Sequence, residues 1–272
     1  SHKSVTIFAR FTLKKSPVAG LEGAHLIIWT TTPWTMPGNR AMACGADIDY
    51  SAVKVTEIAD GALARIGDVI CLADALREDV FAQTGILAAE TVAQFKGSEM
   101  AGAVAAHPLA SEGYDHDVPV LLADYVTTEQ GTGFVHIAPG HGPEDFELAH
   151  LKHGIEVPDT VGEDGVILPH LPVFGGMHVL RDNAKIAEIM AEHEGVIGIG
   201  KLVHSYPHSW RSKAPLIYRN TAQWFVSMES HGLRDIALGE LAKTKFYPVT
   251  GQKRLTSMIA QRPDSVSYTH LR

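Results

Sequence analysis

Short apolar runs separated by Gly or Pro fill much of the first 140 positions of the chain. Runs rich in Val, Ile, Thr and Phe between such breaks are typical of β-strands. We therefore expect strands at residues 5–13, 25–32, 50–55, 65–73, 118–126 and 131–138. The last two are separated by Thr-Thr-Glu-Gln at 127–130, a length that predicts a hairpin.

Apolar positions at helical spacing follow later in the chain, and they predict helices at 75–85, 142–154, 181–195 and 233–244. The second of these has Pro143 in its first turn, acidic residues after it, and Gly154 at its end, which are typical helix start and stop signals. Its apolar side would consist of Phe146, Leu148 and Leu151. The pattern as a whole predicts a strand-rich α/β protein in which strands dominate the first 140 residues and helices lie around them.

Residues 155–180 are rich in Gly and Pro, which predicts a long irregular connection, either a functional flap or a subdomain joint. From residue 204 the chain becomes aromatic and basic. We therefore expect a core at 1–200 and a separate segment at 201–264. The end, 265–272, reads Ser-Val-Ser-Tyr-Thr-His-Leu-Arg and looks like vector or junction sequence.

Composition narrows the possible environments of the chain. Its 272 residues include only two cysteines, Cys44 and Cys71, which argues against a disulfide framework or a zinc ribbon and for a reducing compartment. No apolar run approaches the length of a membrane span, and the N-terminus lacks the apolar core of a signal peptide. We expect a cytoplasmic protein with no membrane partner.

The net charge of −8 speaks against a nucleic-acid partner, but its distribution is uneven. Residues 1–200 carry 12 Lys and Arg against 27 Asp and Glu, whereas residues 201–262 carry 10 Lys and Arg against three acids. The basic part, with Trp210, Tyr218 and Trp224, could track phosphates and stack bases. One open interpretation is therefore a non-catalytic nucleic-acid-binding module, and another is a surface that docks on a further domain.

Two segments carry the candidate chemistry. Thr30, Thr31 and Thr32 end an apolar strand before Pro33, so hydroxyls lie beside backbone groups that Pro33 leaves unpaired. In the second segment His136 ends a strand, and Glu144 and Asp145 open the next helix. A carboxylate there is favoured by the helix dipole, so capping is as good an explanation as function on position alone.

A metallohydrolase is a rival interpretation of the same histidines and acids. His136, His141 and Asp145 could be ligands, with His204 and His208 as the nearest further candidates. Ser209 and Ser212 stand where a zinc knuckle would need cysteines. The number of ligands is too small, and we expect no metal site.

At this point a family resemblance becomes specific. The segments Trp-Thr-Thr-Thr-Pro-Trp-Thr-Met-Pro-Gly-Asn-Arg at 29–40 and Gly-Thr-Gly-Phe-Val-His-Ile-Ala-Pro-Gly-His-Gly-Pro-Glu-Asp-Phe at 131–146 resemble the editing (CP1) domain inserted in class I aminoacyl-tRNA synthetases, in particular the isoleucine type. The valine and leucine types share the pattern and stay alternatives, as does a non-catalytic tRNA-binding module. The resemblance also implies a barrel-like sheet with helices packed outside it. The likeness includes residues 204–228 and runs from about residue 5 to Asp264. The His-x-Gly-His and Lys-Met-Ser-Lys-Ser motifs of the synthetic site are missing, so we expect an excised editing domain.

The resemblance implies post-transfer editing, the hydrolysis of valine wrongly esterified to isoleucine tRNA. It implies that Asp145 binds the substrate α-ammonium and that His136 walls the side-chain pocket against isoleucine. It further implies that Thr30, Thr31 and Thr32 hold the ester and terminal adenosine, and that Asn39 lies near the same pocket. The backbone of Gly133, Phe134 and Val135 would lie along the adenosine.

A positioned water suffices to hydrolyse an activated ester, so we expect no cofactor. ATP and magnesium would belong to the absent synthetic core. The expected partners are the 3′ end of a mischarged tRNA and the rest of the synthetase.

Overall fold

A computed structural model describes residues 2–221 and 224–267 of the chain. These form two compact units, Ser1–Asn220 and Thr221–Arg272, and each is described here by itself.

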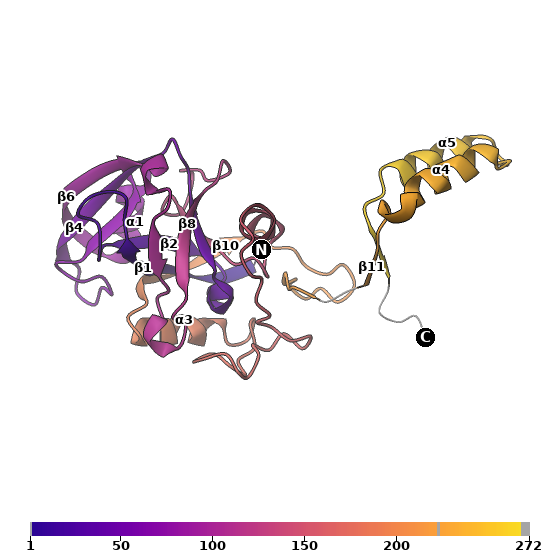
Figure 1. Cartoon of the computed structure of the whole chain (residues 1–272). Coiled ribbons are helices and arrows are strands. Elements are labelled where there is room, and N and C mark those ends of the chain that lie inside the picture. Colours follow the sequence, from indigo (N-terminus) through magenta and orange to yellow (C-terminus); the bar gives the residue numbers. More distant parts are fainter. Residues whose placement is uncertain (1, 222–223, 268–272) are drawn as a thin grey trace. The chain divides into compact units, whose positions relative to one another are not determined.

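The first unit is built on a closed barrel (Figure 1). Each of its six strands pairs with the next, and the ring closes where the last strand pairs with the first. In order around the ring they are β1 (His2–Lys15), β7 (Val104–Ala106), β8 (Asp117–Leu122), β3 (Ala41–Cys44), β9 (Phe134–Ile137) and β2 (His25–Thr30). The predicted strand-rich, barrel-like α/β architecture is thereby confirmed.

Further strands extend the sheet on both sides of the closure. β10 (Val196–His204) pairs with the first half of β1, while the other half pairs with β7. β5 (Val69–Ala73), β4 (Asp49–Ile58) and β6 (Ile86–Lys96) continue from β2. β1 is long enough to pair with β10, β2 and β7. The sheet can therefore close into a barrel and still continue beyond it.

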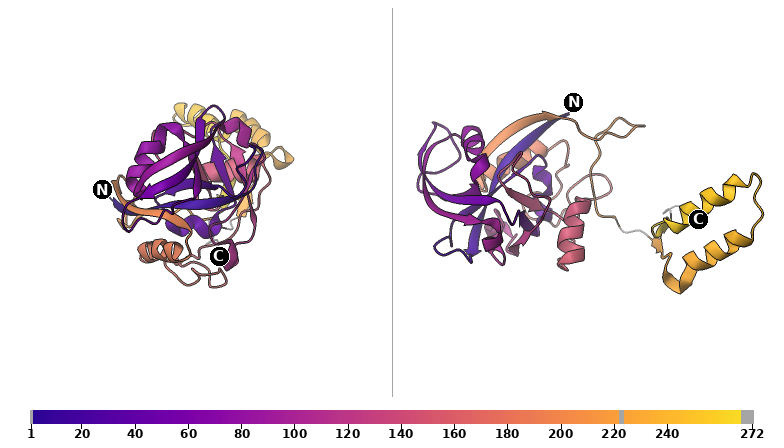
Figure 2. Two further views of the ribbon diagram at one scale, coloured as in Figure 1. Left: turned by 90° about the vertical axis from the view of Figure 1, so that its left-hand side faces the viewer. Right: turned by 90° about the horizontal axis from the view of Figure 1, so that it is seen from above.

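Helices lie around the sheet. α3 (Asn183–Glu192) packs against β1, β10 and the 3-10 helix η1 (Pro33–Gly38) on the outside of the barrel, as Figure 2 shows from two further sides. α1 (Arg77–Thr84) ends at Gly85, whose left-handed φ of 73° suits glycine. α2 (Pro143–Asp145) continues directly into the π-helix η5 (Phe146–Lys152). Short 3-10 turns make up the rest: η2 (Asp74–Leu76), η3 (Gly97–Met100) and η4 (Ala110–Glu112).

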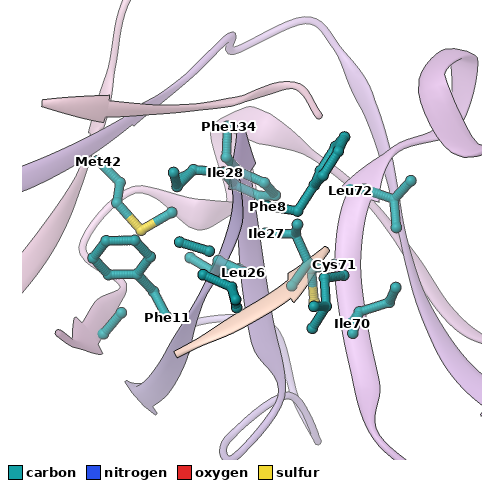
Figure 3. Close-up of a cluster of buried hydrophobic side chains, with 14 of the residues drawn as sticks. Phe8, Phe11, Leu26, Ile27, Ile28, Met42, Ile70, Cys71, Leu72 and Phe134 are labelled. Carbon is teal, nitrogen blue, oxygen red and sulfur yellow. The ribbon is translucent and has the colours of Figure 1, made fainter. Parts of the chain in front are cut away.

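The apolar core has two parts. The main cluster gathers side chains from β1, β2, β3, β5 and β9, as Figure 3 shows for Phe8, Phe11, Leu26, Ile28, Met42, Cys71 and Phe134. A second cluster packs Leu148 and Ala149 of η5 onto Ala41, Ala43 and Ile137. This smaller cluster attaches the helical segment that carries Asp145 to β3 and β9.

Several sequence-based expectations differ from this structure. The predicted hairpin of 118–126 with 131–138 is wrong, because β3 lies between β8 and β9 and pairs with both. The predicted helix 142–154 is a short α-turn followed by a π-helix, and Leu151 is 65% exposed rather than packed. The patterns also left out β3, β6, β7, β10 and the helix α5 (Thr250–Ala260).

The irregular connection 155–180 contains two isolated bridges, Val161 with Ile167 and Val166 with His178. Val161, Ile167 and Phe174 are buried in the main core, so this segment is packed structure.

The second unit contains η6 (Ser230–Gly232), the helices α4 (Leu233–Lys243) and α5, and the short strands β11 (Trp224–Val226) and β12 (Ser265–Ser267). The boundary expected near residue 200 falls inside β10, and the units divide after Asn220. The expected tail 265–272 begins with β12, and 268–272 lie outside the described residues. Within the part that the structure describes, we find no helix with the length and apolarity to cross a bilayer.

Candidate active site

The ends of two neighbouring parallel strands bring the candidate residues together. β2 and β9 pair in parallel with Ile28 opposite Phe134. Two residues further along each strand the chain reaches Thr30 and His136. These side chains therefore lie at the same level at the carboxyl ends of adjacent strands.

A chain of threonine hydroxyls runs from the end of β2 into η1. The Thr30 Oγ1 accepts the backbone N–H of Thr32 at 3.1 Å and lies 3.1 Å from the Thr32 hydroxyl. The Thr32 hydroxyl lies 3.4 Å from that of Thr35, which in turn donates to the Thr32 carbonyl at 2.8 Å. The strand expected to reach Thr32 ends at Thr30, because Pro33 begins η1. Thr31 is half-buried.

His136 is held at both ring nitrogens and is only 8% exposed. Its Nε2 lies 3.0 Å from the Thr35 hydroxyl, and its Nδ1 lies 2.8 Å from the Asn39 Nδ2. Asn39 Nδ2 also donates to the Ala41 carbonyl, which fixes the orientation of the amide. Nδ1 of His136 must therefore accept, and Nε2 carries the proton and donates to Thr35.

The imidazole of His136 is consequently neutral. Burial, together with a smaller contribution from nearby His141, lowers its pKa to about 3. Sequence reasoning found His136 and Asn39 but missed Thr35. The available signal was the i, i+3 spacing from Thr32 to Thr35 across Pro33, which suits a 3-10 turn.

Asp145 contacts the chain just beyond the end of β9. Its Oδ2 accepts the backbone N–H of Ala138, the residue after β9, at 2.8 Å. The side chain is half-buried, and burial raises its pKa to about 6, against the lowering effect of the Ala138 hydrogen bond. Glu144, next to it, is exposed.

Tyr125, from the loop after β8, lies near Asp145 and Glu144. Burial raises its pKa to about 12, with further contributions from Asp145, Glu144 and Glu147. Sequence reasoning missed this neighbour, since nothing local in the loop relates Tyr125 to a helix about 20 residues further along the chain.

His141 is committed to the packing around the site. Its Nδ1 donates to the Tyr218 carbonyl at 2.9 Å, so Nε2 accepts from the Thr160 hydroxyl at 2.6 Å. Its ring meets Trp34 edge-on at 5.0 Å between centroids. The approach requires glycine at 38, because a Cβ there would lie 2.9 Å from the His141 Cδ2.

The backbone of 133–135 has protein partners. Tyr50 donates its hydroxyl to the Gly133 carbonyl at 2.6 Å, and the Thr132 hydroxyl accepts the Phe134 N–H. Both edges of β9 are paired, with β3 and with β2, and the Phe134 ring is buried in the main core. These contacts occupy much of the backbone that was expected to lie along the adenosine.

Among residues 2–221 and 224–267, no three His, Cys, Asp or Glu side chains gather as a metal ion would require. The ring nitrogens of His136 and His141 are engaged as described. The other candidate ligands are engaged as well: His204 lies 2.9 Å from the Ser4 hydroxyl, and His208 bonds the Tyr206 carbonyl.

The family model for class I tRNA synthetases (I, L, M and V) matches residues 21–268. The chain belongs to this family. Similar proteins include isoleucine--tRNA ligases from three bacteria. That of Pelagibacter ubique is 47% identical over 263 residues, which cover 97% of this chain and 28% of that protein. That of Gluconobacter oxydans is 42% identical and covers 96% and 28%, and that of Caulobacter vibrioides is 42% identical and covers 97% and 29%.

This class I tRNA synthetase chain thus spans less than a third of the length of those relatives. Its fold also resembles a solved structure. The crystal structure of GlLeuRS-CP1 superposes with a TM-score of 0.54 at 12% identity, covering 74% of this chain and all of that one. The barrel therefore has the fold of that CP1 domain.

The pKa of Asp145 leads to a test of stability against pH. Its folded pKa of about 6 lies above the ordinary value of 3.8, so the folded protein binds more protons than the unfolded chain between these values. Stability therefore falls as the pH rises through this window. Replacing Asp145→Asn removes the buried charge and keeps an oxygen for Ala138, so we expect it to raise the free energy of unfolding at about pH 7.5 by roughly 1–3 kcal/mol.

Urea denaturation of both proteins between about pH 4 and 7.5 measures this difference. The gain should shrink as the pH falls through about 6 toward 4, because Asp145 becomes protonated in the folded protein over this range and no longer carries a buried charge. Glu144→Gln at the exposed neighbouring position is the control and should change stability by less than about 0.5 kcal/mol. A variant D145N that is less stable than the parent at pH 7.5 contradicts the account of a buried charge.

Proposed function

We propose that this chain is the editing part of an isoleucine--tRNA ligase and that it hydrolyses valine wrongly esterified to isoleucine tRNA. The observation that carries the proposal is the meeting of three kinds of groups at the ends of β2 and β9. A half-buried carboxylate, a neutral fixed imidazole and a line of hydroxyls lie around one strand terminus. The isoleucine--tRNA ligases that match 97% and 96% of this chain support the choice of isoleucine over valine or leucine.

Asp145 binds the α-ammonium of the aminoacyl ester. A carboxylate and an ammonium form a charge-assisted hydrogen bond, which is strong where solvent is limited. The bound cation also offsets the unfavourable burial that raises the Asp145 pKa. Asp145 is ionised above about pH 6, so the clamp is charged at neutral pH.

His136 acts as a wall of the side-chain pocket. Both of its nitrogens are engaged by Thr35 and Asn39, and its pKa of about 3 keeps it neutral. It therefore transfers no proton in this proposal. An imidazole held in one orientation excludes the longer side chain of isoleucine, which a looser group would accommodate.

Water attacks the ester carbonyl without a side-chain nucleophile. The hydroxyls of Thr30, Thr31 and Thr32 hold the ester and orient the water, and they stabilise the negative charge that develops on the carbonyl oxygen. The Asn39 Oδ1 is buried and has no hydrogen-bond partner among the described residues, so it is an acceptor suited to a substrate hydroxyl. This hydrolysis needs no cofactor.

The partners in this proposal are the 3′ end of the mischarged tRNA and the rest of the synthetase. We propose a cytoplasmic location, in which Cys44 and Cys71 stay the free, buried thiols that the structure contains.

The clamp is tested by Asp145→Asn, with Glu144→Gln as the matched control. Loss of the charge removes the partner of the ammonium, so we expect deacylation of valyl-tRNA by D145N to fall by about 100-fold or more. The control should deacylate like the parent, because Glu144 is exposed. The release of radiolabelled valine measures the rate, and a D145N rate equal to that of the parent contradicts the assignment.

The wall is tested by His136→Ala with isoleucyl-tRNA as substrate. Removing the ring opens the pocket, so hydrolysis of the isoleucyl ester should rise about tenfold or more relative to hydrolysis of the valyl ester. This change lies within the discrimination that one methylene group allows, for which isoleucine enzymes are the usual example. His170→Ala, at an exposed position, is the control. If H136A folds and still refuses isoleucine, another group sets the specificity.

The parent protein also tests the choice among the three types. If it hydrolyses a threonyl or an isoleucyl ester faster than the valyl ester, the valine or leucine type is favoured.

A further inference from the structure

A second cleft, of about 310 Å³, opens beside the candidate site. One wall is the loop after β9 with the start of α2, and the other is the segment just before the end of the first unit. The residues that matter here are Pro139, Pro143, Phe146, Tyr218, Arg219 and Asn220. Its volume is at the small end of the range for ligand clefts.

The cleft lies next to Asp145, since a Cβ added to Gly142 in its lining would lie 3.5 Å from the Asp145 carboxyl carbon. Pro143 and Phe146 flank this residue in sequence, and both line the cleft. The Asp145 carboxylate bonds the amide of Ala138, next to Pro139 in the cleft wall. A ligand whose ammonium is held by Asp145 would therefore place its adjoining parts over this cleft.

The lining suits a ligand that combines a flat aromatic ring with a negatively charged group. Phe146 and Tyr218 offer aromatic rings, the prolines offer flat apolar surfaces, and Arg219 supplies a guanidinium. Nucleobases stack on aromatic side chains and on guanidinium groups with little dependence on their sequence. The lining residues include no carboxylate, which would repel a phosphate.

Tyr218 is exposed and yet anchored. Its side chain is 59% exposed, while its backbone carbonyl accepts the hydrogen bond from His141. The ring is thus presented at the surface by a fixed backbone, and removing it leaves the His141 bond in place.

We propose that this cleft holds the nucleobase that precedes the terminal adenosine of the tRNA, an inference that rests on the proposed function. The base stacks on Tyr218 and Phe146, and Arg219 faces the phosphate that joins the two nucleotides. The chain thereby grips the tRNA end at two points, through the amino acid at Asp145 and through the base in the cleft.

The test compares two uncharged probes, the dinucleotide cytidylyl-adenosine and an analogue that lacks the cytosine base but keeps the ribose and phosphate. Titration calorimetry should give an affinity about tenfold higher for the complete dinucleotide. Tyr218→Ala should reduce this ratio to about one. Tyr247→Ala, at a tyrosine that is 91% exposed in the second unit, should keep the parent ratio.

Equal affinities of the parent for the two probes overturn the proposal, as does a ratio that Y218A leaves unchanged. If Y218A does not fold, the chemical shifts of the Tyr218 ring protons in the parent decide, since cytidylyl-adenosine should shift them and the abasic analogue should not. A proline-rich peptide that shifts them when neither dinucleotide does would make the cleft a peptide groove and refute a base site. The binding assay needs no ester, so a chain that binds the base but leaves valyl-tRNA intact contradicts the proposed function and not this inference.

Discussion

The imidazole of His136 is hydrogen-bonded at both ring nitrogens, and the arrangement of the candidate site depends on this constraint. Asn39 points its amide N–H groups at the Ala41 carbonyl and at Nδ1, so the proton of the ring must reside on Nε2. The Thr35 hydroxyl accepts a hydrogen bond from this N–H and donates its own hydrogen bond to the Thr32 carbonyl. The buried ring thus has a single neutral tautomer and a single orientation, and this is why we give it the role of a wall and not of a base.

One parallel pairing of barrel strands places the His136 imidazole at the candidate site. Most neighbours in the ring of strands are antiparallel, but β9 runs parallel to β2, so their carboxyl ends coincide and bring His136 to the threonines. The second apolar cluster then packs η5 on the other side of β9 and brings Asp145 to Ala138. Holding a carboxylate there is unfavourable in the absence of a cation, as its raised pKa indicates. A site that binds an ammonium ion is expected to contain a carboxylate whose pKa is raised in this way while the cation is absent.

Local patterns in the sequence predicted the strand-rich first part and the helices near 75–85, 181–195 and 233–244. The resemblance of two segments indicated the barrel-like sheet and the family. They failed where the pairing is non-local. Ala41–Cys44 is short and contains no β-branched or aromatic residue, so nothing marks it as the strand that separates β8 from β9. β6 mixes apolar with charged and polar residues, and its pairing with β4 sets its structure. Thr35 and Tyr125 escaped notice because their partners near the site lie far away in sequence, about 100 positions for Thr35 and His136.

The protonation state of His136 tests the central claim most directly. Nitrogen-15 NMR of the chain labelled at histidine distinguishes the two neutral tautomers from the cation. The account predicts that His136 keeps the signals of the neutral Nε2–H form from about pH 7.5 down to about pH 4.5, since its pKa lies near 3. A His136 signal that titrates near its ordinary value of about 6.5, or that shows the proton on Nδ1, contradicts the account.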